Sequence, residues 1–351
     1  MPVPVQRDPE RTRAALAGWL SARVAGGGLV EVGDLTVPAG AGFGNETVLF
    51  DAAWPGGGQR LVARIAGAGY QVYPDVRFAE QYRLLAVLAG HPDVPVPPVL
   101  GFEPDPGVLG APFFVMAHVD GRVPADLPSY HRAGWVADLD PAGRREVWER
   151  AVDVLAAVHR LDPQRLGLRF LARPGRDPLL EHYAANLAFF GAGGAVVERA
   201  LAWLRVYRPA PPARPVLLWG DARLGNLVFD GTEVAGVLDW EMAELGPPEA
   251  DVAWFLHLDR HLSEGVGAPR LAGLPGREET LARYAAAGGP ALRDLGYHAV
   301  LAAFRFALIT ARVTALLRRQ QVVPADFPLH RNAVALLDRV LAETAAQPAV
   351  P

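Results

Sequence analysis

The sequence predicts an α+β fold in two lobes, a small antiparallel β-rich N-lobe followed by a larger, mainly helical C-lobe. Three observations support this prediction. Strand-like segments with glycine turns are concentrated before residue 118, amphipathic helical patterns dominate after Gly121, and 351 residues exceed one typical domain. We therefore expect an N-terminal helix within 1–28, an N-lobe at 29–117 and a C-lobe at 118–351.

The N-lobe elements follow from local patterns. Asp8 followed by Pro9 is typical of a helix N-terminus, and apolar residues at helical spacing continue to the glycines at 26–28. Next comes a glycine-rich segment, and its β-branched and aromatic continuation predicts a strand rather than a helix. The further predicted elements are strands at 47–53 and 60–65 joined by a glycine turn, a helix at about 75–89 capped by Asp75, an edge strand at 94–100 and a strand at 112–118.

The C-lobe pattern is helical except for one hairpin. Residues 144–160 form the strongest amphipathic pattern, with Val147, Val154 and Val158 on its apolar face. Weaker helical patterns cover about 178–206, 277–287 and 297–320, and a predicted hairpin at 216–240 interrupts them.

Composition excludes several classes of function. The chain is 51% hydrophobic and 21% charged with a net charge of −4, which gives no reason to expect nucleic acid as a partner. It contains no cysteine and no lysine, so thiolate catalysis, lysine Schiff bases and the Gly-Lys-Ser/Thr phosphate loop are impossible. The pattern predicts no signal peptide and no membrane span, and we expect a cytoplasmic protein.

The hairpin carries the most specific motif. Asp221 is followed by Asn226 five residues later and by Asp239 thirteen residues beyond that. This is the spacing of kinase-like phosphoryl transfer, in which the first Asp meets the acceptor hydroxyl and the other two residues hold Mg²⁺. Arg223 lies close enough to Asp221 in sequence to contact the migrating phosphoryl group.

These motifs resemble the aminoglycoside-phosphotransferase-like family, a branch of the protein-kinase-like fold. The resemblance covers about residues 30–320. Within the family, the chain is most similar to the generic phosphotransferase group, which is related to domains joined to acyl-CoA dehydrogenases. The motifs that carry it are Gly44-Asn45-Glu46-Thr47, Arg64, Glu80, 113–116, Trp219 to Asn226, and Leu238-Asp239-Trp240-Glu241 through Asp251. Two positions depart from the family: Trp219 stands where His is usual, and Gly246-Pro247-Pro248-Glu249 replaces Gly-Asp-Pro.

The resemblance implies a Mg²⁺-dependent kinase of a small-molecule hydroxyl, with ATP as the phosphoryl donor and GTP as the alternative donor. Asp221 and Arg223 would be catalytic, and Asn226 and Asp239 would bind the metal. Adenine would lie between the lobes against the main chain at 117–119. The implied nucleotide-binding residues are Gly42, Phe43, Gly44, Asn45, Thr47, Arg64, Glu80, Met116, Ala117, His118 and Val119.

The acceptor and the alternatives stay open. Arginines at 165, 169, 173, 260 and 270 favour a neutral or acidic acceptor, such as a hydroxyacyl compound, over a polycationic aminoglycoside. No membrane partner is expected, and the sequence does not predict an oligomeric state. A catalytically inactive nucleotide-binding or scaffold protein is the main alternative, supported by Trp219. A dinucleotide-dependent oxidoreductase is disfavoured because a strand follows the glycines.

Overall fold

The computed structural model describes residues 7–23, 28–37, 44–67 and 71–346. The chain divides into two compact units, and each is considered by itself. The first comprises Met1–His91, Val96–Val119 and Leu316–Val323; the second comprises Pro92–Pro95, Asp120–Ala315 and Pro324–Pro351.

The first unit is built on one antiparallel sheet with the strand order β1-β2-β3-β5-β4. Its longest hairpin joins β2 to β3 through Pro55 and Gly56, where proline presets the turn and Gly56 supplies a φ of 93°. The strands are β1 (Glu31–Val32), β2 (Asn45–Trp54), β3 (Gly57–Ala66), β4 (Val99–Glu103) and β5 (Phe113–Ala117). The sheet therefore confirms the predicted antiparallel, β-rich first part of the chain.

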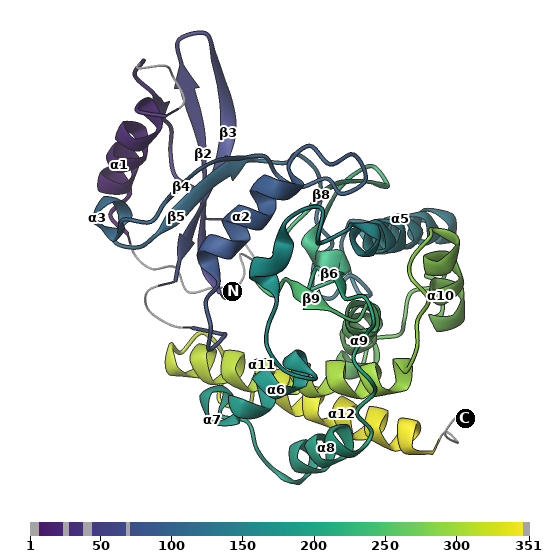
Figure 1. Cartoon of the computed structure of the whole chain (residues 1–351). Helices are drawn as coiled ribbons and strands as arrows, with labels where there is room; N and C mark the ends of the chain where they lie inside the picture. The colour runs from purple at the N-terminus through teal and green to yellow at the C-terminus, as the bar shows by residue number, and fades with distance from the viewer. Residues whose placement is uncertain (1–6, 24–27, 38–43, 68–70, 347–351) are drawn as a thin grey trace. The chain divides into compact units, whose positions relative to one another are not determined.

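Helix α1 (Pro9–Ser21) packs on this sheet (Figure 1). Its N-terminus is capped by Asp8, whose Oδ1 accepts the amides of Glu10 and Arg11 at 3.0 and 3.1 Å. Trp19 lies in the same buried core as Phe113, with ring centroids 5.1 Å apart. Two further helices, α2 (Phe78–Leu88) and the short α3 (Pro106–Leu109), belong to this unit, which also contains the end of α11 (Leu295–Arg319) from Leu316 on.

Two boundaries in this unit were predicted wrongly. The cap of α2 is Arg77, without a side-chain hydrogen bond, and not Asp75, because the helix begins only where Phe78 becomes buried. The predicted strand at 94–100 starts at Val99 instead, since Pro95, Pro97 and Pro98 have no amide hydrogen for a ladder. Its position at the edge of the sheet is as predicted.

The second unit is mainly helical, as predicted, with two small strand pairs, β6 with β9 and β7 with β8. Its strands are β6 (Val216–Leu218), β7 (Leu227–Asp230), β8 (Glu233–Val237) and β9 (Glu244–Gly246). Its helices are α4 (Trp135–Asp138), α5 (Pro141–Arg160), α6 (Pro178–Ala185), α7 (Leu187–Phe190), α8 (Ala195–Val206), α9 (Glu249–Leu262), α10 (Arg277–Ala286), α11 (Leu295–Arg319, in this unit to Ala315) and α12 (Leu329–Ala345). Short 3₁₀ turns are η1 (Leu168–Leu171), η2 (Leu224–Asn226) and η3 (Glu264–Val266).

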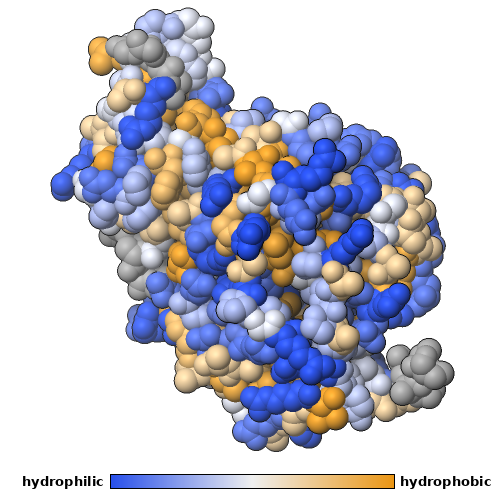
Figure 2. Space-filling model, viewed as in Figure 1, coloured by the Kyte–Doolittle hydropathy of each residue, from blue (hydrophilic) through white to orange (hydrophobic). Residues whose placement is uncertain are grey.

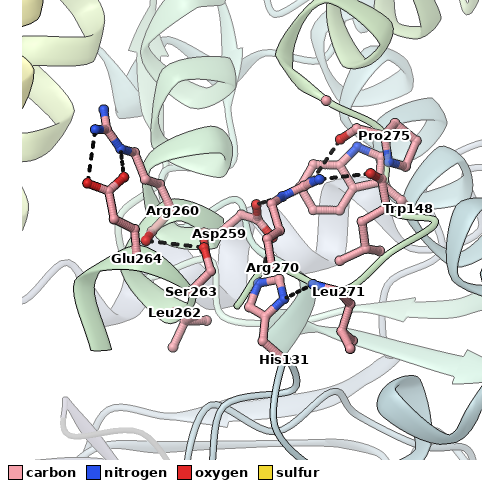
Figure 3. Close-up of polar contacts among 12 residues, drawn as sticks. His131, Trp148, Asp259, Arg260, Leu262, Ser263, Glu264, Arg270, Leu271 and Pro275 are labelled. Carbon is pink, nitrogen blue, oxygen red and sulfur yellow. Dashed lines mark hydrogen bonds and ion pairs between the residues drawn. The ribbon is translucent and has the colours of Figure 1, made fainter. Parts of the chain in front are cut away.

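Helix α9 forms the centre of this unit. Twelve of its residues are buried, so it has no amphipathic stripe, and the sequence patterns did not predict it. Figure 3 shows how its C-terminal half is held: Arg270 Nε donates to Asp259 Oδ2 at 2.7 Å, and its other nitrogens donate to the carbonyls of Leu274 and Pro275. Burial favours protonation of Asp259, but His131 and Arg270 hold its pKa below the usual range.

Helix α11 also lies mostly inside this unit. By length and composition it is the one described helix that could cross a membrane, but 83% of its most apolar window is buried within the protein. That is the behaviour of a core helix.

On the face shown in Figure 2, hydrophobic residues are scattered among hydrophilic ones.

Three buried histidines of α9 and α11 predict acid sensitivity. Burial lowers the pKa of His257 to about 3, of His261 to about 4 and of His298 to about 3. Their side chains are only 5%, 2% and 5% exposed; His257 also faces the charges of His261 and Arg260, and His298 that of Arg305. The unfolded chain, with histidine pKa near 6.5, binds more protons below that pH, so the free energy of unfolding should fall as pH falls from about 6.5 toward 4.

We expect each of these histidines to cost about 2 kcal/mol of stability at pH 5 relative to pH 7. Urea unfolding at both values measures this. The glutamine in His261→Gln cannot titrate, so the free energy of unfolding of this variant should depend less on pH, by the amount that one histidine contributes. An equally steep dependence in His261→Gln would contradict the assignment.

Candidate functional site

The predicted motif hairpin forms a loop between β6 and β9 in the second unit. The three buried residues of β6 lead into Trp219, Gly220 and Asp221; then come η2, β7, β8 and the segment from Leu238 to Trp240. The Leu238 amide donates to the Asn226 carbonyl at 2.9 Å. This hydrogen bond brings the segment that carries Asp239 beside Asn226.

Gly220 allows the chain to turn sharply out of β6. Its φ is 90°, and a Cβ there would lie 2.1 Å from the Met242 carbonyl oxygen. A side chain is therefore excluded by conformation and by space. Asp239 also has a positive φ, 57°, which is rare outside glycine and is typical of strained positions at functional sites.

Asp251 anchors the start of the loop. Its carboxylate is 1% exposed and accepts the amides of Trp219 at 2.6 Å and Gly220 at 2.9 Å. His159 Nε2 lies 3.2 Å from the same carboxylate, and its Nδ1 lies 2.7 Å from the Tyr284 hydroxyl. Asp251 thus has a structural role, and both ring nitrogens of His159 have polar partners in the core.

Trp219 fastens the same loop to the other arm of the hairpin. Its side chain is fully buried, and its indole Nε1 donates to the Leu238 carbonyl at 2.7 Å, next to Asp239. The ring also packs on Trp240 with centroids 6.1 Å apart. The residue that departs from the family pattern is therefore well accommodated and holds the hairpin together.

The carboxylate of Asp221 is held by three donors. Arg223 Nε and Asn226 Nδ2 donate to Oδ2 at 2.9 and 2.7 Å, and Trp254 Nε1 donates to Oδ1 at 2.8 Å. Hydrogen bonds to a charged carboxylate are stronger than those between neutral groups. The side chain predicted to receive the acceptor hydroxyl is thus fixed in orientation.

Arg223 connects Asp221 to a second carboxylate. Its NH1 donates to Asp126 Oδ2, and its side chain is 20% exposed. Burial acts against its charge, but Asp126 and Asp221 together raise its pKa above the usual value. Arg223 therefore stays cationic between two acids.

Asn226 and Asp239 suit a magnesium ion. Asn226 Nδ2 donates to the Asp221 carbonyl at 3.0 Å and to Asp221 Oδ2, which uses both hydrogens of the amide. The Oδ1 atom of Asn226, on the other side of the amide group, is thereby left as a possible metal ligand. Mg²⁺ is bound by oxygen ligands, usually one or two from the protein, with phosphates and water completing the shell. The residues present fit such an ion.

The predicted nucleotide-binding residues lie in the first unit, and Gly42 and Phe43 fall outside the described residues. Asn45 and Thr47 are buried on β2, and Arg64 NH1, across the ladder on β3, donates to Thr47 Oγ1 at 3.0 Å. Glu80 lies in the first turn of α2, and its part in nucleotide binding stays a prediction. Gly44 directly precedes β2.

The residues predicted to face adenine lie at and just beyond the end of β5. Met116 and Ala117 end β5, and His118 and Val119 come directly after it. The amides of Ala117 and His118 donate to the carbonyls of Pro98 at 2.8 Å and Arg60 at 3.0 Å. The amide left for a ligand in this stretch is therefore that of Val119, judged over the part of the chain that the structure describes.

Sequence reasoning missed two residues of the site. Asp126 reaches Arg223 from 97 positions away, a separation without any sequence signal. Trp254 follows Asp251 by three residues on α9, a spacing that would have placed both on one face had this helix been predicted. Among the residues that the structure describes, no group of three or more His, Cys, Asp or Glu side chains could hold a metal.

Comparisons of sequence identify relatives of the chain. Residues 36–291 match the model of the phosphotransferase enzyme family. "Probable acyl-CoA dehydrogenase IBR3" of Arabidopsis thaliana is 29% identical over 275 residues, which are 71% of this chain and 32% of that protein. The human acyl-CoA dehydrogenase family member 11 is 32% identical over 170 residues, 46% of this chain and 20% of its own length. The chain thus spans a third or less of these curated relatives.

Solved structures share the fold. A protein assigned as an aminoglycoside phosphotransferase in Ralstonia eutropha superposes with a TM-score of 0.72 at 24% identity, covering 95% of this chain and 98% of that one. A thermostable mutant of aminoglycoside phosphotransferase APH(4)-Ia, in a ternary complex with AMP-PNP and hygromycin B, gives a TM-score of 0.60 at 17% identity, covering 95% and 100%. These similarities confirm the predicted kinase-like α+β fold.

Proposed function

Because this chain belongs to the phosphotransferase enzyme family, we propose that it transfers the γ-phosphoryl group of ATP to the hydroxyl of a small molecule, with Mg²⁺ bound at Asn226 and Asp239. The observation that carries the proposal is the arrangement of Asp221. Its carboxylate is oriented by three donors, and the amide of Asn226 is turned so that its oxygen is available to a metal.

In the proposed reaction Asp221 orients the acceptor hydroxyl and takes its proton. The acceptor oxygen forms a bond to the γ-phosphorus as the bond from that phosphorus to the β–γ bridging oxygen breaks, and ADP leaves. Proton transfer comes late because the transition state is largely dissociative, so positioning contributes most. Asn226 and Asp239 would hold Mg²⁺, which would offset the negative charge of the phosphates.

Other residues of the chain stabilise charge. In the proposal Arg223 exchanges part of its contact with Asp126 for an oxygen of the migrating phosphoryl group. In the proposal Gly44, Asn45 and Thr47 bind the phosphates, and Arg64 steadies them; Gly42 and Phe43, predicted to do the same, lie outside the described residues. In the proposal the amide of Val119 donates a hydrogen bond to the base, and Met116 lies behind the base. GTP is the alternative donor.

The nature of the acceptor needs revision in one respect. Of the arginines that favoured a neutral or acidic compound, Arg173 pairs with Glu244, Arg260 with Glu264 and Glu343, and Arg270 with Asp259. Their charge is therefore compensated within the protein. Of the five arginines, only the exposed Arg165 and Arg169 still favour a neutral or acidic acceptor. The trial acceptors should accordingly include hydroxyacyl compounds, other alcohols and aminoglycosides such as hygromycin B.

Replacing Asp239 with alanine tests the metal and nucleotide site. Calorimetric titration with ATP and with GTP, each with and without Mg²⁺, should show magnesium-dependent binding to the wild type. The variant should lose most of that dependence because one of two protein ligands is gone. Asp230→Ala is the matched control, since Asp230 is an exposed aspartate at the end of β7 and should bind as the wild type does.

Nucleotide binding that is indifferent to both Mg²⁺ and Asp239→Ala would favour the alternative, an inactive nucleotide-binding or scaffold protein. Trp219 was the main support for that alternative. Its indole hydrogen bond to the Leu238 carbonyl supports an intact loop instead. The cytoplasmic location stays a proposal.

A further inference from the structure

Helix α9 contacts the catalytic loop at a second point, one turn beyond Asp251. Trp254 is 2% exposed, and its Nε1 donates to Asp221 Oδ1 at 2.8 Å. Residues three apart share one face of a helix. The same face of α9 therefore holds the main chain of the loop through Asp251 and the side chain of Asp221 through Trp254.

The two oxygens of Asp221 are not equivalent. Oδ2 accepts hydrogen bonds from Arg223 and Asn226, whereas Oδ1 accepts within the described residues only that of Trp254. A carboxylate oxygen has two lone pairs, so Oδ2 is filled and Oδ1 retains one position for a donor. Oδ1 is thus the atom that can receive the acceptor hydroxyl, and Trp254 sets its orientation.

The indole of Trp254 is itself held from α11. The guanidinium carbon of Arg305 lies 4.7 Å from the centroid of the indole ring, and Phe306 packs edge-on at 5.9 Å. Arg305 is 2% exposed and also lies 5.2 Å from the ring of Tyr183 on α6. A buried cation over an aromatic face is attracted to it and restricts its movement. Such a contact leaves Trp254 little freedom to turn away from Asp221.

We propose that Trp254 is a positioning residue, held by Arg305, that aims Oδ1 of Asp221 at the acceptor hydroxyl. The proposal rests on the phosphotransferase function proposed above. It assigns Trp254 no contact with the nucleotide or the metal. Replacing Trp254 should therefore slow the chemical step and leave nucleotide binding unchanged.

Trp254→Phe keeps the aromatic ring and removes the N–H group. In the full-length protein with MgATP and the best acceptor of the panel, kcat should fall roughly 10- to 100-fold, since small misplacements of reacting groups cost about that much. The KM for ATP should stay within about twofold, because uniform binding is untouched. An unchanged kcat would overturn the proposal.

Trp19→Phe is the matched control. Trp19 is 5% exposed, its Nε1 donates to the Glu103 carboxylate at 2.8 Å, and Arg23 lies over its ring at 4.3 Å. The local chemistry is the same, but Trp19 lies in the first unit and takes no part in the proposed site. A similar loss of thermal stability without loss of kcat is expected, and an equal loss of kcat would assign the effect of Trp254 to stability alone.

Two further measurements separate positioning from a general structural role. In an Asp221→Asn background, Trp254→Phe should change the residual turnover less than twofold, because the effect acts through Asp221; a full additional loss would overturn the proposal. In proton–nitrogen spectra of the protein without ligands, Asp221→Asn should shift the indole resonance of Trp254 and leave that of Trp19 in place. If the Trp254 resonance did not shift, Trp254 would not be hydrogen-bonded to Asp221, and the proposal would be overturned. A wild type that phosphorylates nothing would instead refute the proposed function, a distinguishable result.

Discussion

Replacing Asp221 with alanine is expected to lower kcat by about 100- to 10,000-fold while nucleotide binding changes little. This range is typical for loss of a general base, and Asp221 is not assigned a contact with the nucleotide or the metal. The carboxylate also organises Arg223, Asn226 and Trp254, whose donors would lose their acceptor. Turnover and ATP titration on one preparation measure the two quantities.

Asp221→Asn and Asp230→Ala complete this experiment. The asparagine keeps the size of the side chain but cannot take a proton, so its turnover should be nearly as low. Asp230 is exposed nine positions further along the same motif, and its alanine variant should behave as wild type. Loss of ATP binding in Asp221→Ala would contradict the role assigned to Asp221.

Replacing Asp251 with alanine should give the second large effect, this time on stability. Two backbone amides and His159 would lose a buried acceptor, and removing one member of a buried charged network costs roughly 3–5 kcal/mol. The turn at Gly220 would no longer be held, so turnover should fall as well. Urea unfolding of wild type and variant measures the first effect.

Asp153→Ala is the comparison for Asp251. Asp153 forms an ion pair with Arg283, and the two side chains are 27% and 37% exposed. A pair this open to solvent contributes less than about 1 kcal/mol. If both variants lost the same stability, Asp251 would not be the anchor of the loop.

The sequence predicted the elements whose signals are local. Asp8 with Pro9 marked the start of α1, and the glycine turn marked the β2–β3 hairpin. The spacing of Asp221, Asn226 and Asp239 gave the candidate site, whose function stays a proposal. These features depend on capping, turn conformation and residue order, which act over a few neighbours. Each could therefore be recognised without coordinates.

Local signals failed where burial or distance decides. Helix α9 is buried on nearly all sides, so its pattern lacked a polar face, and α12 was not predicted although it is amphipathic. The start of α2 depended on where Phe78 enters the core and not on the nearest acidic residue. The compensation of Arg260 and Arg270 by carboxylates likewise could not be foreseen from composition.

By itself, the sequence determined the α+β fold, the family and the spacing of Asp221, Asn226 and Asp239, on which the proposed function rests. Only the tertiary structure decided how Asp221 is held: by Arg223 and Asn226 within the loop, and by Trp254 from a helix that follows it. It also introduced Asp126 from far along the chain. The physical reason is that hydrogen bonds and ion pairs depend on distance and direction in space, and residue order limits these only for near neighbours.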